Sequence, residues 1–262
     1  QQAKEERMRI VPTLARLVLA GFVVSLALAL AAGFGKQFGA WDFRFGFQVL
    51  SWGVFLGIGT LVVGLVWLVA RLITGSGAST LWGVVGLVGA ALVVAIPLHG
   101  YYTAKYLVPP IHDITTDIQD PPQFRAVLPL RTAAINPPAY DGTTKMTWQG
   151  KTLTVAEWQR KSYPDIFTAR VLITPDRLYE RGLRAARKMG WHIVLADEKN
   201  HRIEATDTSL FFGFTDDIAI RVAKSGMGAK LDIRSESRVG VSDIGKNAAR
   251  IRAFMKALAA MG

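Results

Sequence analysis

Residues 231–254 read LDIRSESRVGVSDIGKNAARIRAF, and this stretch predicts a strand that leads into a helix. It begins with apolar and charged side chains in the period-two alternation of a half-buried strand: Leu231, Asp232, Ile233 and Arg234. The chain is expected to turn at Gly240, and either Ser242 or Asp243 is the expected N-cap of the helix. Apolar residues then recur at helical spacing: Ile244, Ala248, Ile251, Met255 and Leu258.

Polar side chains are denser in this stretch than elsewhere in the chain. The candidate site consists of Arg234, Ser235, Ser237, Arg238, Ser242, Asp243, Asn247 and Arg250, with Asp207 from an upstream strand. In one hypothesis it binds an anion or a partner, because Arg234, Arg238 and the free N–H groups of the helix's first turn could converge on one anion. In the other it is an ordinary strand-to-helix corner, with Asp243 capping and the arginines solvated. The sequence leaves both open.

The run RSxSRxGxSDxGxNxxRI, together with EATDTSLFFGFTDDIAIRV upstream, resembles DUF1499, a bacterial and chloroplast family of unknown function. The resemblance covers roughly residues 112–262. The first run contributes Arg234, Ser235, Ser237, Arg238, Gly240, Ser242, Asp243, Gly245, Asn247, Arg250 and Ile251. The second contributes Thr206, Asp207, Thr208, Phe212, Phe214, Asp216 and Asp217. The resemblance implies a membrane-associated or exported domain, and it implies no particular reaction.

Composition narrows the class of protein. The chain has 262 residues, half of them hydrophobic, and a net charge of +11, with a mean hydropathy of +0.26. Cysteine is absent, which excludes a disulfide framework and a thiolate metal site. The basic charge is mixed with many acidic residues, which suits an anionic membrane surface or ligand, and no motif predicts a nucleic-acid partner.

Three apolar segments, 17–32, 47–70 and 72–98, predict a membrane anchor over residues 1–108. A helix needs about twenty residues to cross the hydrocarbon core, so the first segment must begin near Pro12. A signal-peptidase site at 29–31 is an alternative that would remove this first span. Glycines on the second and third segments predict close packing among the three helices or a docking face for a partner's helix.

Basic residues predict the orientation of the anchor. Lys4, Arg7, Arg9 and Arg16 precede the first span and Arg71 is placed between the second and third, whereas Lys36 and Arg44 lie in the first loop. This bias places the N-terminus in the cytoplasm and the C-terminal domain in the periplasm, with the spans in a bacterial inner membrane. Trp67 and Trp82 are expected at the inner interface, and the lipid bilayer is the first predicted partner. The spans carry no central acidic residue or lysine, which argues against a transporter.

Residues 109–150 are predicted to form a proline-rich extended connector, because seven of the 11 prolines fall between 109 and 138. Phe124, Val127 and Leu130 are its expected anchors on the following domain. A metal site at His112, Asp113 and Asp117 is disfavoured because no second histidine lies nearby, and no cofactor or metal is predicted.

Residues 151–262 predict an α+β domain, in which an antiparallel sheet is covered by helices on one face. Helices are expected over 154–161 and 174–189, followed by hairpins over 191–208 and 216–236 and the closing helix. The second helix carries a basic face, which is either solvated or in contact with anionic lipid or an acidic partner: Arg177, Arg181, Arg184, Arg187 and Lys188. The aromatic loop 210–214 either plugs into the core or forms an apolar surface patch.

No nucleophile, P-loop or dinucleotide motif supports an enzyme. The best catalytic candidates are Asp207, Asp216, Asp217 and Asp243, but adjacent Asp216 and Asp217 would point to opposite faces of a strand. The sequence therefore predicts a membrane-anchored periplasmic binding or accessory protein, which assists a membrane complex or an envelope process by recognising a membrane-protein partner or an anionic lipid or glycan. The alternative is an enzyme that acts on a lipid or glycan through aspartate carboxylates.

Overall fold

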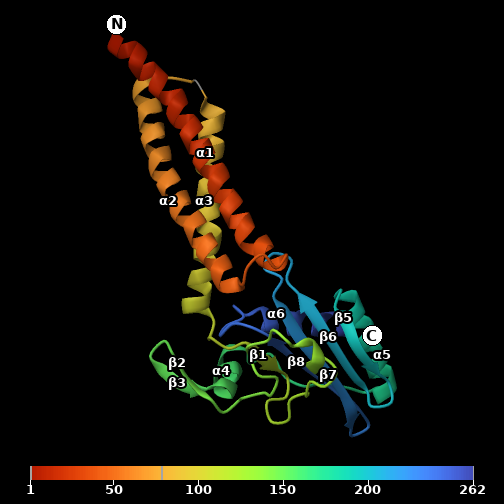
Figure 1. Ribbon diagram of the computed structural model, residues 1–262. Helices are drawn as coiled ribbons and strands as arrows, with labels where there is room; N and C mark the ends of the chain where they lie inside the picture. Colours follow the sequence, from red (N-terminus) through yellow and green to blue (C-terminus); the bar gives the residue numbers. More distant parts are fainter. Residues whose placement is uncertain (1, 78, 262) are drawn as a thin grey trace. The chain divides into compact units, whose positions relative to one another are not determined.

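The computed structural model describes residues 2–77 and 79–261. The chain divides into two compact units (Figure 1). The first unit comprises Gln1–Tyr101 together with Leu210–Gly213, and the second comprises Tyr102–Ser209 together with Phe214–Gly262. The predicted boundaries at residues 108 and 150 stay predictions.

The first unit is built from three long apolar helices, as the sequence predicts. They are α1 (Gln2–Gln37), α2 (Phe43–Thr74) and α3 (Thr80–Tyr102). Three segments are long and apolar enough to cross a membrane: Ile10–Gln37, Phe43–Thr74 and Thr80–Leu107. The expected break at Arg71 is wrong, because Arg71 lies in the last turn of α2 and the helix ends at Gly75, which is left-handed at φ 65°.

Glycines allow the three helices to approach closely. A Cβ added at Gly86 would lie 2.7 Å from the backbone of Val18, and one at Gly83 would lie 2.2 Å from the ring of Trp67. On α2, a Cβ added at Gly57 or Gly64 would likewise meet side chains of α3, so these glycines serve packing among the helices. The side chain of Trp67 is fully buried in the helical unit, and its predicted place at the inner membrane interface stays a prediction.

The aromatic loop is part of this helical unit. Phe211 meets Phe34 edge-on with ring centroids 5.6 Å apart, and Phe212 lies 5.1 Å from Phe47. Lys36 Nζ donates a hydrogen bond of 2.7 Å to the carbonyl of Gly213. The sequence predicts that this loop either packs into the core or forms an apolar surface patch. The loop is packed, but in the helical unit and not in the core of the sheet domain.

The second unit is an α+β domain around a six-stranded antiparallel sheet, as predicted (Figure 1). The strand order is β1-β8-β7-β6-β5, and β4 also pairs with β8. These strands are β1 (Asp113–Thr115), β4 (Ala169–Val171), β5 (His192–Asp197), β6 (Arg202–Thr208), β7 (Thr215–Ser225) and β8 (Gly228–Ser237). A separate hairpin joins β2 (Lys145–Trp148) to β3 (Lys151–Thr154). The helical elements are η1 (Thr103–Leu107), η2 (Leu128–Leu130), α4 (Val155–Ser162), α5 (Pro175–Lys188) and α6 (Lys246–Ala259).

Helix starts follow local signals in the sequence. Thr154 and Glu157 form a capping box at α4, and the Thr174 side chain accepts the backbone N–H of Arg177 at the start of α5. The predicted N-cap of α6 is wrong. Gly245, with φ 78°, occupies that position, although the carboxylate of Asp243 still accepts the backbone N–H of Asn247 at 2.6 Å.

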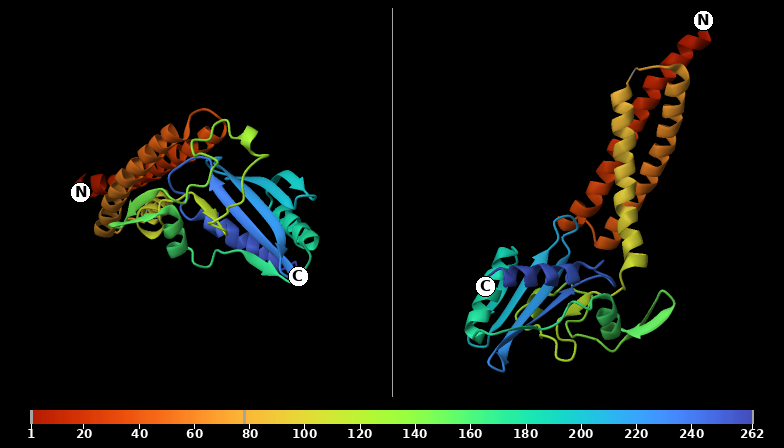
Figure 2. Two further views of the ribbon diagram at one scale, coloured as in Figure 1. Left: turned by 90° about the horizontal axis from the view of Figure 1, so that it is seen from below. Right: turned by 180° about the vertical axis from the view of Figure 1, so that it is seen from behind.

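The main hydrophobic core lies between the sheet and helices α5 and α6 (Figure 2). Leu178 of α5, Ile251 of α6 and Ile220 of β7 are almost completely buried there. Phe254, which the helical pattern did not include, is fully buried and stacks on Trp191. Ile244 lies outside α6 and is 42% exposed, so its predicted place in the helical apolar pattern is wrong.

The other face of the sheet is covered by residues 116–138, which we call the strap. Phe124 and Val127 are buried against Ala219 of β7, as the sequence predicts. Leu130 is not an anchor, because its side chain is 48% exposed. Residues 109–150 contribute two extended strands, β1 and β2, and one short helical turn, η2, where the chain departs from the predicted extended conformation.

Candidate functional site

Alternation along β7 and β8 divides the candidate site residues between the two faces of the sheet. Arg234 and Arg238 face the strap, where their guanidinium groups meet carboxylates. Ser235 and Ser237 face α6 and hydrogen-bond to Asn247. The structure therefore does not bring the two arginines and the N-terminus of α6 to one point, as an anion site of the predicted kind requires.

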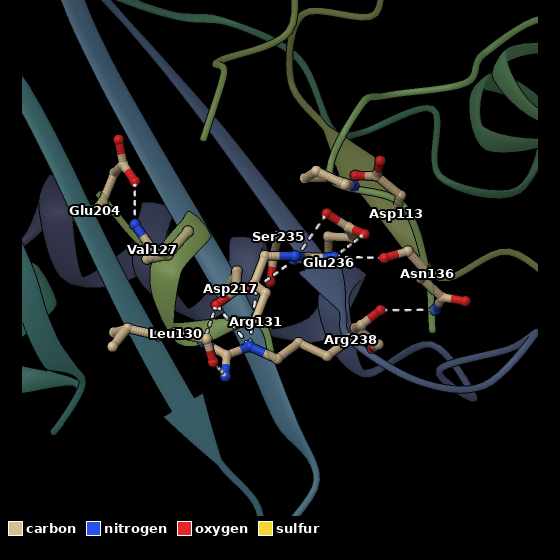
Figure 3. Close-up of polar contacts among 12 residues, drawn as sticks. Asp113, Val127, Leu130, Arg131, Asn136, Glu204, Asp217, Ser235, Glu236 and Arg238 are labelled. Atoms are coloured by element: carbon tan, nitrogen blue, oxygen red, sulfur yellow. Dashed lines mark hydrogen bonds and ion pairs between the residues drawn. The ribbon is translucent and has the colours of Figure 1, made fainter. Parts of the chain in front are cut away.

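On the strap side, three arginines alternate with three carboxylates in what we call the paired layer, whose members other than Arg234 are labelled in Figure 3. Its members are Asp113, Arg131, Asp217, Arg234, Glu236 and Arg238. Arg234 binds both oxygens of Asp113, at 2.9 and 2.7 Å. When all six groups are ionised, their formal charges cancel.

Arg131 ties the strap to the two central strands. Its guanidinium binds Asp217 of β7, and its Nη2 lies 3.0 Å from Glu236 Oε1 of β8. It also donates to the carbonyl of Asn136 at 2.7 Å. Arg238 binds the other side of Asp217 at 2.8 Å and donates to the carbonyl of Leu130 at 2.6 Å. Both arginines therefore satisfy strap carbonyls that have no partner strand.

Burial makes these pairs interdependent. Asp217, Arg234 and Glu236 are 0% exposed, and Arg131 is 8% exposed. Removal from water, and next the charge of Asp113, raise the pKa of Glu236 to about 8 against the opposing effect of two arginines. A carboxylate in such a setting is held by its partners, and taking one partner away leaves a buried charge without compensation.

Arg234 is additionally enclosed by aromatic rings. Its guanidinium carbon lies 4.5 Å from the centroid of Phe124 and 5.7 Å from that of Tyr140. Its Nη1 and the hydroxyl of Tyr140 are buried, and neither has a hydrogen-bond partner among the described residues. The solvated arginine of the corner hypothesis is thus wrong for this residue.

On the α6 side, Arg250 organises the remaining candidate residues. It binds Asp207 at 2.8 Å and Asp216 at 2.6 Å, and its Nη1 donates to Ser235 Oγ at 3.0 Å. Asn247 Nδ2 donates to the carbonyl of His112 at 2.7 Å and to Ser237 Oγ at 3.0 Å. This group joins α6 to the sheet and to the segment before β1. The prediction that Asp216 and Asp217 point to opposite faces is confirmed.

Asp243 and Ser242 have local roles at the start of α6. Burial raises the pKa of Asp243, while its carboxylate accepts the backbone N–H groups of Gly245 and Asn247. Ser242 Oγ accepts the N–H of Ile244 at 3.2 Å. Both side chains therefore shape the turn that precedes the helix, and their part in binding stays a prediction.

The sequence reasoning missed Arg131 and Glu236 as members of the site, and treated Asp113 only as a disfavoured metal ligand. One signal could have found them: β8 carries charges at alternate positions, Asp232, Arg234 and Glu236, on the face opposite its apolar residues. A strand with charged residues at alternate positions has a charged face that is either exposed to solvent or paired with opposite charges. The described residues include no group of three or more His, Asp or Glu side chains placed to hold a metal ion.

The contacts of the candidate aspartates indicate a structural role more than a catalytic one. Each of the four aspartates considered as a catalytic group is engaged: Asp207 and Asp216 by Arg250, Asp217 by two arginines, and Asp243 by backbone N–H groups. A general base must be free to accept a proton from a substrate. The enzyme alternative therefore gains no support from this geometry.

The fold and its polar groups define a class of protein: candidate membrane-spanning helices followed by an antiparallel α+β domain whose central charges are paired internally. The chain belongs to the DUF1499 family, described as a protein of unknown function, whose family model matches residues 113–258. The match begins at the first residue of β1, so the strap and the paired layer lie within the family domain. The resemblance inferred from the sequence is confirmed. No curated protein matches the chain.

Proposed function

We propose that this chain is a membrane-anchored binding protein whose α+β domain recognises an acidic partner through the exposed face of α5. The observation that carries the proposal is a stripe of basic side chains, spaced by four, three and four residues: Arg177, Arg181, Arg184 and Lys188. At 1.5 Å rise per residue the stripe is roughly 16 Å long. The opposite side of α5 is buried in the core through Tyr179 and Ala186.

The stripe differs from the paired layer in its charge balance. Arg184 lies 3.8 Å from the exposed Glu180, a contact that contributes little in water. Within the described part of the chain, no carboxylate oxygen lies within 4.0 Å of the other three basic groups. Their positive potential is therefore available to attract an acidic surface and to raise the rate of encounter.

The arginines of the candidate site have a supporting role in the proposed function. Arg234, Arg238 and Arg250 are neutralised by carboxylates, so an anion would have to displace an existing partner to bind them. We propose that they hold the sheet, strap and α6 in one rigid body that presents α5. Pre-organisation of this kind reduces the entropy lost on binding.

The spans would provide the anchor, with the N-terminus in the cytoplasm and the α+β domain in the periplasm. Basic residues support this orientation, because Arg71 and the N-terminal Lys4, Arg7 and Arg9 belong to the same end of the helical hairpins. The proposed role is that of an accessory protein, which assists a membrane complex or an envelope process by holding an acidic partner at the membrane.

Charge reversal tests the role of α5. The stripe variant replaces all four basic residues of the stripe by glutamate: Arg177→Glu, Arg181→Glu, Arg184→Glu and Lys188→Glu. The control makes the same replacement at four scattered exposed basic residues: Arg125, Arg160, Lys199 and Lys224. Both variants change the net charge equally. Full-length proteins are purified from native membranes in mild detergent, and bound proteins and lipids are identified by cross-linking and mass spectrometry.

We expect the wild type and the control to retain an acidic protein that the stripe variant loses, with affinity lowered about tenfold or more, or at least about 1.4 kcal/mol. The interaction should weaken as the salt concentration rises. Equal retention by the stripe variant, with cross-links elsewhere, would refute this function. If the wild type retains only an anionic lipid or glycan, the proposed acidic protein partner is wrong and that ligand is the partner of α5.

A further inference from the structure

The loop before α6 lies against the segment that leaves the third candidate span. That span ends at Leu107, and Val108 follows it directly. A Cβ added at Gly245 would lie 3.5 Å from Val108 Cγ1. The N–H of Asp243 donates to the carbonyl of Ile111 at 3.3 Å, and the ring of His112 contacts the carbonyl of Val241 at 3.3 Å. Residues 241–245 are therefore held beside the first residues beyond the span.

The end of the span is itself fixed within the second unit. Trp148 Nε1 donates to the carbonyl of Lys105 at 3.0 Å, and Gln149 Nε2 donates to that of Tyr106 at 2.7 Å. These side chains, at the tip of the β2–β3 hairpin, satisfy carbonyls of η1 that have no partner further along the helix. Hydrogen bonds therefore hold both the end of the span and the loop within the second unit, and they fix the distance between these two segments.

Two apolar side chains of this loop face outward. Val241 is 72% exposed and Ile244 is 42% exposed, whereas Asp243 between them is buried. Ile244 adopts φ 56°, a left-handed conformation in which a β-branched residue is an outlier and asparagine is common. The side chain does not contribute to the core, so the fold of the loop does not explain why isoleucine is here. An observed outlier of this kind is evidence for a role outside folding.

The surroundings carry the features of a membrane interface. Tyr106 and Leu107, at the end of the span, are 46% and 56% exposed. Lys246 is exposed directly after the loop, and Lys105 lies in the last turn of η1. Tyrosine is enriched at the level of lipid head groups, and lysine is attracted to anionic lipids. Apolar tips flanked by lysines suit insertion at this depth better than contact with water.

We infer that residues 241–245 form a lipid-contacting loop, which inserts Val241 and Ile244 into the head-group and upper acyl region of the membrane that α3 enters. The inference rests on the proposed membrane anchor and is independent of the proposed partner of α5. Its consequence is that the domain has a second attachment to the bilayer beside the span, which would restrict how the domain rotates.

The absence of native cysteine makes the depth of single residues measurable. Five single-cysteine variants of the full chain carry a spin label and are reconstituted in nanodiscs of phosphatidylcholine and phosphatidylglycerol. The labelled sites are Val241, Ile244, Leu92, Leu172 and Met227. Leu92, near the middle of α3 and 55% exposed, reports on the anchor, whereas Leu172 and Met227 are exposed apolar controls at 84% and 97%. Collision with oxygen, which partitions into lipid, is compared with collision with a water-soluble nickel chelate.

We expect labels at Val241 and Ile244 to collide with oxygen several times more often, relative to nickel, than labels at Leu172 and Met227. If Leu92 reports the acyl region and Val241 matches Met227, the lipid-contacting loop is refuted and the anchor stands. If Leu92 also reports water, the anchor fails and the loop with it. A label at Val241 shielded from both reagents would mean that protein covers the loop, which also overturns the inference.

A second pair of variants separates lipid contact from folding. Val241→Asn with Ile244→Asn removes the apolar tips and gives residue 244 a side chain that tolerates its φ. We expect an unchanged or raised melting temperature in detergent, together with loss of the loop's protection from hydrogen exchange in nanodiscs. The matched pair Leu172→Asn with Met227→Asn should leave that protection unchanged. A lowered melting temperature of the first pair would show a structural role and contradict the inference.

Discussion

At the scale of single residues, the paired layer joins three arginines to three carboxylic acids. The paired layer buries arginines and carboxylates that would each be costly to bury alone. Arg234 reaches Asp113 across 121 positions of sequence, and Arg131 reaches Glu236 across 105. Such pairs need not add net stability over apolar residues, but the loss of one member is strongly destabilising. The arginines therefore position the strap on the sheet.

Arg131→Met should destabilise the centre of the sheet, because it leaves Asp217 and Glu236 with fewer compensating charges. We expect the free energy of opening of β7 and β8 to fall by about 3–5 kcal/mol. Hydrogen exchange of the full-length protein in detergent measures this locally. The exposed Arg125→Met on the same strap is the control, with a change within about 0.5 kcal/mol. Similar protection in both variants would contradict the assigned role of Arg131.

The pKa of Glu236 predicts a pH dependence. Burial raises it from 4.5 to about 8, so the folded state keeps a proton that the unfolded state has released. The contribution of this group is fully present below pH 4.5 and is lost as the pH rises through 8. We therefore expect the opening free energy of β8 to decrease over this window. Glu236→Gln should flatten that part of the profile, and parallel profiles of both proteins would contradict the raised pKa.

At the scale of elements, the start of α6 depends on a side chain that precedes the helix. Asp243 binds the N–H groups of Gly245 and Asn247, although it lies outside the N-cap position. The left-handed Gly245 bends the chain so that this carboxylate reaches the first turn. Sequence spacing therefore identified the right acceptor but the wrong helix boundary.

Asp243→Ala should increase hydrogen exchange in the first turn of α6, with a loss of about 1 kcal/mol. Asp243→Asn keeps a side-chain oxygen acceptor and should lose less. Ser242→Ala removes one hydrogen bond in the turn before the helix and serves as the neighbouring control. An Asp243→Ala variant whose α6 exchanges like the wild type would show that the carboxylate does not stabilise the helix.

At the scale of the whole molecule, each unit has its own set of packed aromatic residues. Phe211 and Phe212 pack in the helical unit, whereas Trp191 and Phe254 pack in the core of the sheet. The loop between β6 and β7 is thus assigned by its contacts to a different unit from the strands that flank it. Substitutions in this loop should affect the helices and spare the sheet.

Phe211→Ala with Phe212→Ala should lower the stability of the helical unit by about 1–3 kcal/mol, since each aromatic pair contributes about 0.5–1.5 kcal/mol. Hydrogen exchange in detergent should rise in α1 near Phe34 and in α2 near Phe47. Exchange of β7 and β8 should stay as in the wild type. Leu210→Ala, at a residue that is 81% exposed, is the control. Equal loss of protection in the sheet would show that the two packed regions unfold together.

Much of this architecture follows from the sequence by itself. Three apolar helices, the hairpin of β7 and β8, and the capped start of α5 were predicted because their signals are local: apolar length, period and capping residues. The opposite orientation of Asp216 and Asp217 also follows from strand geometry alone. The family assignment rests on spaced residues of one continuous region and needed no structure.

The tertiary structure decided what is paired with what. It added β1 to the sheet beside β8, moved Leu210–Gly213 into the helical unit, and separated Arg234 from the start of α6 by the thickness of the sheet. It also paired the arginines of the candidate site with Asp113, Asp217 and Glu236. The physical reason is that a charge or an aromatic ring has many acceptable partners of similar energy. Only the closed fold determines which of them lies within reach.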